Sequence, residues 1–197
     1  MRSVLGAEIS GSVATAGGRL LGFRADRVDL DDEGHPLLVD FKTSASALTT
    51  LKTSKSVRRD MLQAISRGRG LQAAAYALGA CGDGQARGRY AYLDPNAGDE
   101  IANELKSDDP ALGAEFARAV ESAMAAWDSG ELPPRVIDAD TGKEPRLCDY
   151  CEVSDACRRG ESGARQRLSA WGEAAATAHV DGKRVWRVVL DRHEDAR

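Results

Sequence analysis

The chain has 197 residues, of which 42% are hydrophobic and 29% charged, so it is long enough to fold as one domain with a sizeable core. No run approaches the roughly 18 consecutive apolar residues of a membrane helix, and the first residues lack the pattern of a secretory signal. We therefore expect a cytoplasmic protein with no membrane association. The formal net charge of −4 excludes a uniformly basic nucleic-acid binder, although it allows a local basic patch.

The charge is unevenly distributed along the chain. Residues 52–69 carry six basic side chains and one acidic one, whereas residues 94–121 carry eight acidic side chains and two basic ones. Most such runs are solvated faces. The basic segment remains a candidate for contact with phosphates.

The first third of the sequence predicts strands. Residues 4–14, 20–30 and 36–42 are extended, apolar-rich runs separated by a Gly17-Gly18 turn and by the polar loop 31–34. Two such runs around a Gly-containing polar loop indicate a β-hairpin, with the first run as a third strand.

The middle of the sequence predicts a loop, two helices and one further strand. The polar residues 44–56 favour a surface loop. Apolar residues at helical spacing predict a helix over 71–78, and residues 89–93 form a strand ending in a turn. Asp109 as N-cap, with Pro110 next, predicts a helix that ends at Gly130, and we expect its apolar stripe in the core: Phe116, Val120, Met124 and Trp127.

The end of the chain differs in character from the rest. Residues 132–160 are irregular and rich in cysteine, 161–178 could form a helix, and 184–190 a strand or an exposed arm. We expect an α/β core over 1–131, a Cys-rich segment over 132–160 and a C-terminal appendage over 161–197. The order of strands and helices indicates a mixed α/β fold.

Charged residues interrupt the apolar strand 36–42 at its exit. Side chains alternate along a strand, so Asp40 and Lys42 share a face with Leu38, while Phe41 lies on the other. Hairpin pairing could bring Asp26 close to Asp40, and a hard cation such as Mg²⁺ would relieve the repulsion between the two carboxylates. The alternative is an ordinary Asp–Lys pair at a strand end.

Three elements in this order resemble the PD-(D/E)XK nucleases of the RecB type. The first is the run Gly22 to Asp29, G-F-R-A-D-R-V-D, and the second is the run Leu38 to Thr43, L-V-D-F-K-T. The third is Gln72-x-x-x-Tyr76, whose two side chains stand one turn apart on a helix. Ala25 occupies the position of the proline in the family motif.

The resemblance implies a restriction-endonuclease-like core, in which helices flank a mixed central sheet, and a metal-dependent nuclease activity. Asp26, Asp40 and the backbone carbonyl of Phe41 would bind Mg²⁺, and Lys42 would be the catalytic lysine. Gln72 and Tyr76 would complete the substrate side. Phosphodiester hydrolysis would use a metal-activated water. The basic segment would guide the DNA backbone through Lys52, Lys55, Arg58 and Arg59.

Cys148, Cys151 and Cys157 form a C-x2-C-x5-C cluster, which in a cytosolic protein favours metal ligation over disulfides. The spacing resembles that of the AddB-type nuclease branch, whose [4Fe–4S] cluster staples the domain. The alternative is Zn²⁺, with Cys81, His179 or His193 as fourth ligand. The upstream motifs favour the iron–sulfur cluster.

Two features of the family have no counterpart in this sequence. Family members have a helix with a metal-contacting His or Glu before the first strand, and the first cluster cysteine lies further upstream. Here Glu8 is the sole early acidic candidate and sits in a strand-like run, and Cys81 is the first cysteine. We therefore expect the chain to be the C-terminal portion of a longer protein.

The sequence supports three functions. The first is a Mg²⁺-dependent DNA exonuclease domain that works with a helicase or helicase–nuclease partner subunit in double-strand-break repair. The second is a catalytically degenerate module of the same fold, retained for DNA binding or docking. The third is a zinc-binding interaction domain.

Overall fold

The computed structural model describes residues 3–43, 54–82, 84–93 and 104–130, with only the backbone at 54–56 and with isolated positions after 130. The chain forms two compact units, 1–121 and 122–197, and the fold described here belongs to the first. No helix in the described ranges is both long and apolar enough to cross a membrane. The predicted boundaries at 131/132 and 160/161 lie outside the described residues and stay a prediction.

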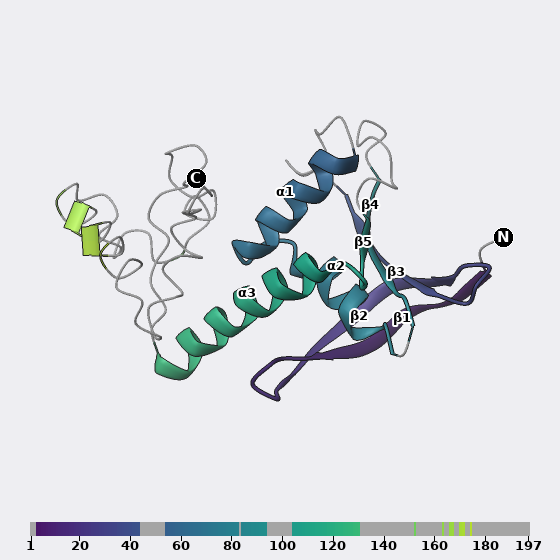
Figure 1. Cartoon of the computed structure of the whole chain (residues 1–197), viewed down its shortest axis with the longest axis horizontal. Coiled ribbons are helices and arrows are strands. Elements are labelled where there is room, and N and C mark those ends of the chain that lie inside the picture. Colours follow the sequence, from purple (N-terminus) through teal and green to yellow (C-terminus); the bar gives the residue numbers. More distant parts are fainter. Residues whose placement is uncertain are drawn as a thin grey trace. The chain divides into compact units, whose positions relative to one another are not determined.

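The described strands form a five-stranded mixed sheet (Figure 1). The strands are β1 (Ser3–Ala14), β2 (Leu20–Leu30), β3 (Pro36–Lys42), β4 (Arg87–Tyr92) and β5 (Glu104–Lys106), and they are neighbours in that order. β3 and β4 are parallel, whereas the other pairs are antiparallel. The predicted mixed α/β fold is confirmed. The short β5 was not predicted, because three residues carry too little alternation to identify a strand.

The β2–β3 hairpin forms where the sequence predicted it. Gly34, with φ of 82°, donates its amide to the carbonyl of Asp31 and closes the turn. Asp31 Oδ1 accepts the amides of Glu33 and His35 at 3.0 and 2.8 Å. These backbone hydrogen bonds, chiefly that of His35, lower the pKa of Asp31. A local Asx-type turn therefore sets the hairpin register.

The described helices are α1 (Ser54–Ser66), α2 (Leu71–Gly79) and α3 (Pro110–Ser129). The predicted loop over 44–56 is wrong at its end, because α1 begins at Ser54. Its apolar side chains follow helical spacing and are buried, and the neighbouring charges hid this pattern. The buried positions are Val57, Met61, Ala64 and Ile65.

Helix α2 packs on the sheet and contributes side chains to the core. It contacts all five described strands, and its Tyr76 packs with Ala25, Val28 and Leu38. The helix lies so close to β4 that a Cβ built on Gly88 would be 1.9 Å from the carbonyl oxygen of Ala73. Glycine at position 88 therefore allows α2 to rest directly on the strand that neighbours β3.

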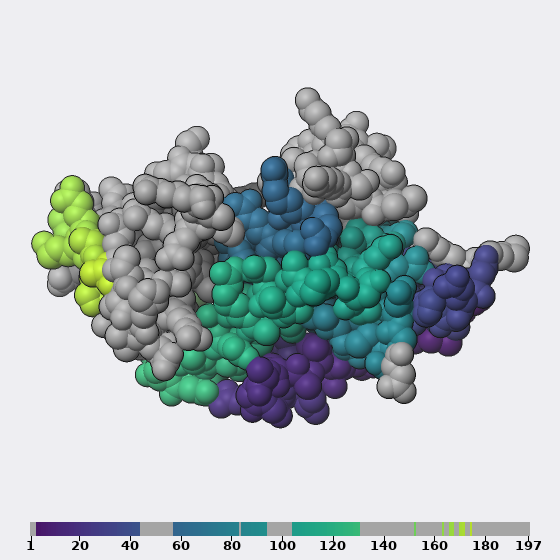
Figure 2. Space-filling model, viewed as in Figure 1, coloured from purple at the N-terminus to yellow at the C-terminus, as the bar shows by residue number. Residues whose placement is uncertain are grey.

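Helix α3 begins and ends as predicted. Asp109 Oδ1 accepts the amide of Ala111 at 3.0 Å, which confirms the N-cap. Phe116 and Val120 are buried, but Trp127 is 72% exposed, so its predicted core position is wrong. Trp127 lies after residue 121, where the first compact unit ends. α1 and α3 lie side by side on the visible surface (Figure 2).

The predicted elements at the end of the chain are almost entirely outside the described residues. Positions 163, 166, 167, 170, 171 and 174 are helical, within the helix predicted over 161–178. The predicted strand or arm over 184–190 and the irregular segment over 132–160 are not described, apart from a turn at Glu152.

Candidate active site

The exit of β3 places two charges on the face that α2 covers. Asp40 and Lys42 follow Leu38, which lies in the core cluster beside Tyr76, whereas Leu37 and Val39 belong to a separate cluster. Asp40 is 4% exposed. The ammonium Nζ of Lys42 lies 2.7 Å from Asp40 Oδ2, and its side chain is 38% exposed. The strand therefore presents a buried carboxylate beside a cation that solvent reaches.

The two predicted helix residues face the same charges. Lys42 Nζ donates a hydrogen bond to Gln72 Oε1 at 2.8 Å. One turn later, the hydroxyl of Tyr76 donates to the carbonyl of Arg24 at 2.8 Å and lies 3.5 Å from Asp40 Oδ1. Gln72 thus steadies the lysine, whereas Tyr76 ties the buried carboxylate to β2.

The Tyr76 hydroxyl stays protonated. Burial raises its pKa above the ordinary value, and the negative charges of Asp40 and Asp26 raise it further. A protonated Tyr76 serves here as a hydrogen-bonding and packing group, not as a base.

Asp26 reaches the site from β2. The β2–β3 ladder ends at the pair Arg27 and Val39, and beyond it Asp26 Oδ2 accepts the amide of Phe41 at 2.7 Å. Arg27 turns away and binds Asp29 Oδ1 through Nε at 2.7 Å, which raises the pKa of Arg27. In the D-R-x-D run, only the first aspartate therefore points to the site, and the other two charges neutralise each other.

The donor set of this site fits Mg²⁺. Asp40 Oδ2 is buried and accepts no well-directed hydrogen bond from the described residues, but the Lys42 ammonium lies 2.7 Å away and compensates its charge. No group of three or more His, Cys, Asp or Glu side chains in the described ranges is placed to hold a metal ion. Asp26 and Asp40 would be the two carboxylates available to a metal at this site. Mg²⁺ commonly binds through one or two carboxylates and keeps several waters.

Glu8 does not fill the place of a third carboxylate. It lies in strand β1, as its sequence context predicted, and has a φ of 55°. Its Oε2 is paired with Arg24 Nε at 2.8 Å. The carboxylate is therefore neutralised by a neighbour on β2.

The predicted DNA-contacting residues are only partly described. Lys52 and the side chain of Lys55 lie outside the described residues. Arg58 binds both carboxylate oxygens of Asp109 at 2.7 Å, so that its charge is compensated by this carboxylate. Arg59 pairs with Asp60 at 3.1 Å. Arg58 thus connects α1 to the N-cap of α3, and contact of these residues with DNA stays a prediction.

The cysteine cluster stays a prediction as well. Cys148, Cys151 and Cys157 lie outside the described residues, as do His179 and His193. Cys81 is half-buried after α2, and its thiol donates to the carbonyl of Leu78 at 3.1 Å.

Sequence reasoning missed one residue of the site. Tyr90 on β4 lies beside Asp40 in register, and Lys42 Nζ is 5.4 Å from the centroid of its ring. The available indication was the alternation of Tyr90 and Tyr92, which places both rings on one face of the predicted strand.

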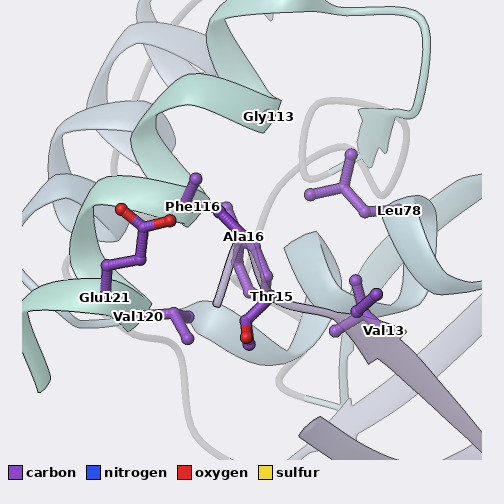
Figure 3. A pocket seen from close by; sticks show the side chains of 10 residues that line it. Val13, Thr15, Ala16, Leu78, Gly113, Phe116, Val120 and Glu121 are labelled. Atoms are coloured by element: carbon purple, nitrogen blue, oxygen red, sulfur yellow. The ribbon is translucent and has the colours of Figure 1, made fainter. Parts of the chain in front are cut away.

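A cavity of about 270 Å³ lies away from these residues (Figure 3). It is formed by the tip of the β1–β2 hairpin around Thr15, by Leu78 near the end of α2, and by Phe116 and Val120 of α3. It is lined by none of the predicted site residues, which in the described sheet and in α2 are Asp26 on β2, Asp40 to Lys42 on β3, and Gln72 and Tyr76 on α2. The cavity is therefore not the candidate active site.

Comparison with known protein families identifies the superfamily and agrees with the fold. The family model of the PD-(D/E)XK nuclease superfamily matches residues 3–158, from β1 past the end of α3. The chain belongs to this superfamily, whose members are generally metal-dependent nucleases, and its mixed sheet with helices is the restriction-endonuclease-like fold. No curated protein matches the sequence.

Proposed function

We propose that the chain is a Mg²⁺-dependent DNA exonuclease domain of a helicase–nuclease type protein that acts in double-strand-break repair. The observation that carries the catalytic part is the position of Lys42 between Asp40 and Gln72, at 2.7 and 2.8 Å. An ordinary ion pair at a strand end does not require a hydrogen bond to a helix residue, whereas the Lys42 ammonium binds Gln72 of α2 as well as Asp40. The helicase context rests on the resemblance of the D-x-K strand and the cysteine spacing.

Each residue of the site has a role in this proposal. Asp26 and Asp40 bind the metal with the carbonyl of Phe41. When bound, Mg²⁺ supplies Lewis-acid polarisation of the phosphate and a more acidic water. Lys42 presents its ammonium to the reacting oxygens, where it stabilises developing negative charge. Tyr76 holds the Asp40 carboxylate through its protonated hydroxyl.

The test compares the full chain with its Asp40→Asn variant on linear and circular DNA, with and without Mg²⁺. We expect the unchanged chain to shorten linear DNA only with Mg²⁺, to leave closed circles intact, and to lose this activity with Asp40→Asn. Asp108→Asn is the matched control, because this exposed carboxylate bonds Gln85 away from the site. DNA that is bound but never cut would instead identify a docking module.

Thermal unfolding gives a second measurement that does not depend on cleavage. Mg²⁺ at about ten times its Kd should stabilise the unchanged chain by ~1.4 kcal/mol. Asp40→Asn should remove this stabilisation, whereas Asp108→Asn should retain it. An equal Mg²⁺ response in Asp40→Asn would contradict the proposed metal site.

The same proposal assigns a [4Fe–4S] cluster to Cys148, Cys151 and Cys157. Its support is the C-x2-C-x5-C spacing. An anaerobic preparation should contain iron and sulfide and absorb visible light, and Cys151→Ser should lose both. Zinc without iron would assign the cysteines to a Zn²⁺ site instead, and Cys81→Ser would then show whether Cys81 is a ligand.

A further inference from the structure

Tyr90 lies directly beside the charged pair of the candidate site. It is 3% exposed, and in the parallel β3–β4 ladder its partner is Asp40. Its ring centroid is 5.4 Å from Lys42 Nζ, within the distance of a cation–π contact. The ring therefore gives the ammonium an aromatic surface on β4, in addition to its contacts with Asp40 and Gln72.

The beginning of α2 has no cap of its own. Gly70 occupies the N-cap position with φ of 67°, a left-handed conformation that favours glycine, and it offers no side chain to the first amides. The hydroxyl oxygen of Tyr90 accepts the amide of Ala73 at 3.2 Å. Ala73 is the third residue of the helix, whose amide an N-cap side chain commonly binds. The cap of α2 is thus delivered by the neighbouring strand.

Tyr90 keeps its proton while it makes both contacts. Burial raises the pKa of Tyr90 to about 12, although the backbone amides of Ala73 and Gln72 lower it in part. Near neutral pH the ring is therefore uncharged, and its oxygen accepts from the helix. Because Gln72 directly precedes Ala73, the cap also fixes the residue that binds Lys42 Nζ.

We propose that Tyr90 is the positioning residue for Lys42: its ring holds the ammonium, and its hydroxyl holds the start of α2 and thereby Gln72. The importance of this position for cleavage rests on the proposed function. The two contacts themselves do not depend on it, so they are tested separately.

The first experiment uses NMR on the metal-free full chain. Tyr90→Phe keeps the ring but removes the cap, so the Ala73 amide should exchange at least about fivefold faster while the ring-current shift of the Lys42 side chain persists. Tyr90→Leu should also lose that ring-current shift. Ser107→Ala, which removes a hydroxyl that accepts the amide of Ala86 away from the site, should leave Ala73 exchange and the Lys42 resonances unchanged.

If Tyr90→Leu does not fold, Tyr90→Met fills the buried space without a ring and replaces it. Unchanged Ala73 exchange in Tyr90→Phe would overturn the cap. Unchanged Lys42 resonances in the ringless variant would overturn the aromatic contact.

The second experiment measures Mg²⁺-dependent DNA cleavage by the same variants. We expect kcat to fall about three- to thirtyfold in the ringless variant, with a smaller fall in Tyr90→Phe and little change in KM, since Tyr90 is buried away from substrate. A fall confined to KM would contradict positioning. If no variant and not even the unchanged chain cleaves DNA, the proposed function fails, while the NMR result still decides the role of Tyr90.

Discussion

The two ends of the β3–β4 pair both carry charged side chains. They differ in how completely each charge is paired with an opposite one. At the entrance of β4, Arg89 is bound to Glu104 at 2.5 and 3.2 Å, and Arg87 is bound to Asp31 at 2.6 Å. At the exit of β3 there are two carboxylates, Asp26 and Asp40, and one ammonium, Lys42, which lies 2.7 Å from Asp40.

The difference between the two ends separates structure from function. Arg89 and Glu104 are also cross-strand partners, and their side chains are 7% and 8% exposed, so each charge has its counterpart. At the other end, Lys42 Nζ compensates the buried Asp40 Oδ2 at 2.7 Å, and Asp26 Oδ2 accepts the backbone amide of Phe41. The balanced end pairs its charges one to one, whereas the unbalanced end has two carboxylates and one ammonium, a net negative charge that would attract a cation.

The largest expected effect comes from breaking the balanced end. Arg89→Met should destabilise the protein by about 2–3 kcal/mol, because it removes two charge-assisted hydrogen bonds to the buried Glu104 carboxylate and leaves it with the longer Arg87 contact at 3.7 Å. Chemical denaturation measures this change. The double variant Arg89→Met with Glu104→Leu should recover much of the loss, since it removes both charges together. A double variant no more stable than the single one would show that the charges are not coupled.

Breaking the unbalanced end should affect activity rather than stability. Lys42→Ala removes a partly exposed cation and should change the free energy of unfolding little, but it should reduce cleavage by about a hundredfold or more. The Mg²⁺-induced thermal shift should persist, because Asp26 and Asp40 remain. Near-normal cleavage rates in initial-rate assays with purified Lys42→Ala protein would remove Lys42 from the reaction.

A smaller effect on the free energy of unfolding is expected at the contact between α1 and α3. Arg58→Ala should destabilise the protein by up to about 1 kcal/mol, because the pair with Asp109 is half exposed. Asp109→Ala, which also removes the N-cap, should cost about 1–2 kcal/mol. Lys106→Ala, a change at an exposed position of β5, serves as the control for loss of a surface cation.

This contact also predicts a dependence on pH. The hydrogen bonds from Arg58, followed by that of the Ala111 amide, hold the pKa of Asp109 below its usual value. The contribution of Asp109 to stability is therefore complete above the unfolded-state pKa near 4 and is lost as the pH falls through the lower folded-state pKa. The difference in stability between wild type and Asp109→Ala should shrink as the pH falls below the unfolded-state pKa of Asp109. A difference that stays constant down to pH 2 would contradict this linkage.

Three cases show what could and could not be predicted from the sequence. The pairing of Lys42 with Asp40 followed from alternation along one strand. The buried face of α1 was overlooked although Val57, Met61 and Ile65 show helical spacing, because the surrounding basic residues favoured a loop. Arg58 was predicted to contact DNA from its place in a basic run, whereas its partner Asp109 is 51 positions away and only packing of α1 beside α3 brings them together.

By itself, the sequence determined the features that depend on a local period. The hairpin follows from its turn, the shared face of Asp40 and Lys42 from a period of two, and the shared face of Gln72 and Tyr76 from one turn of helix. Only the tertiary structure decided that the helix face meets the strand face, and that Tyr90 supplies the cap that Gly70 lacks. The reason is physical: these contacts depend on a parallel β3–β4 pairing and on the close approach of α2 at Gly88, which no local pattern encodes.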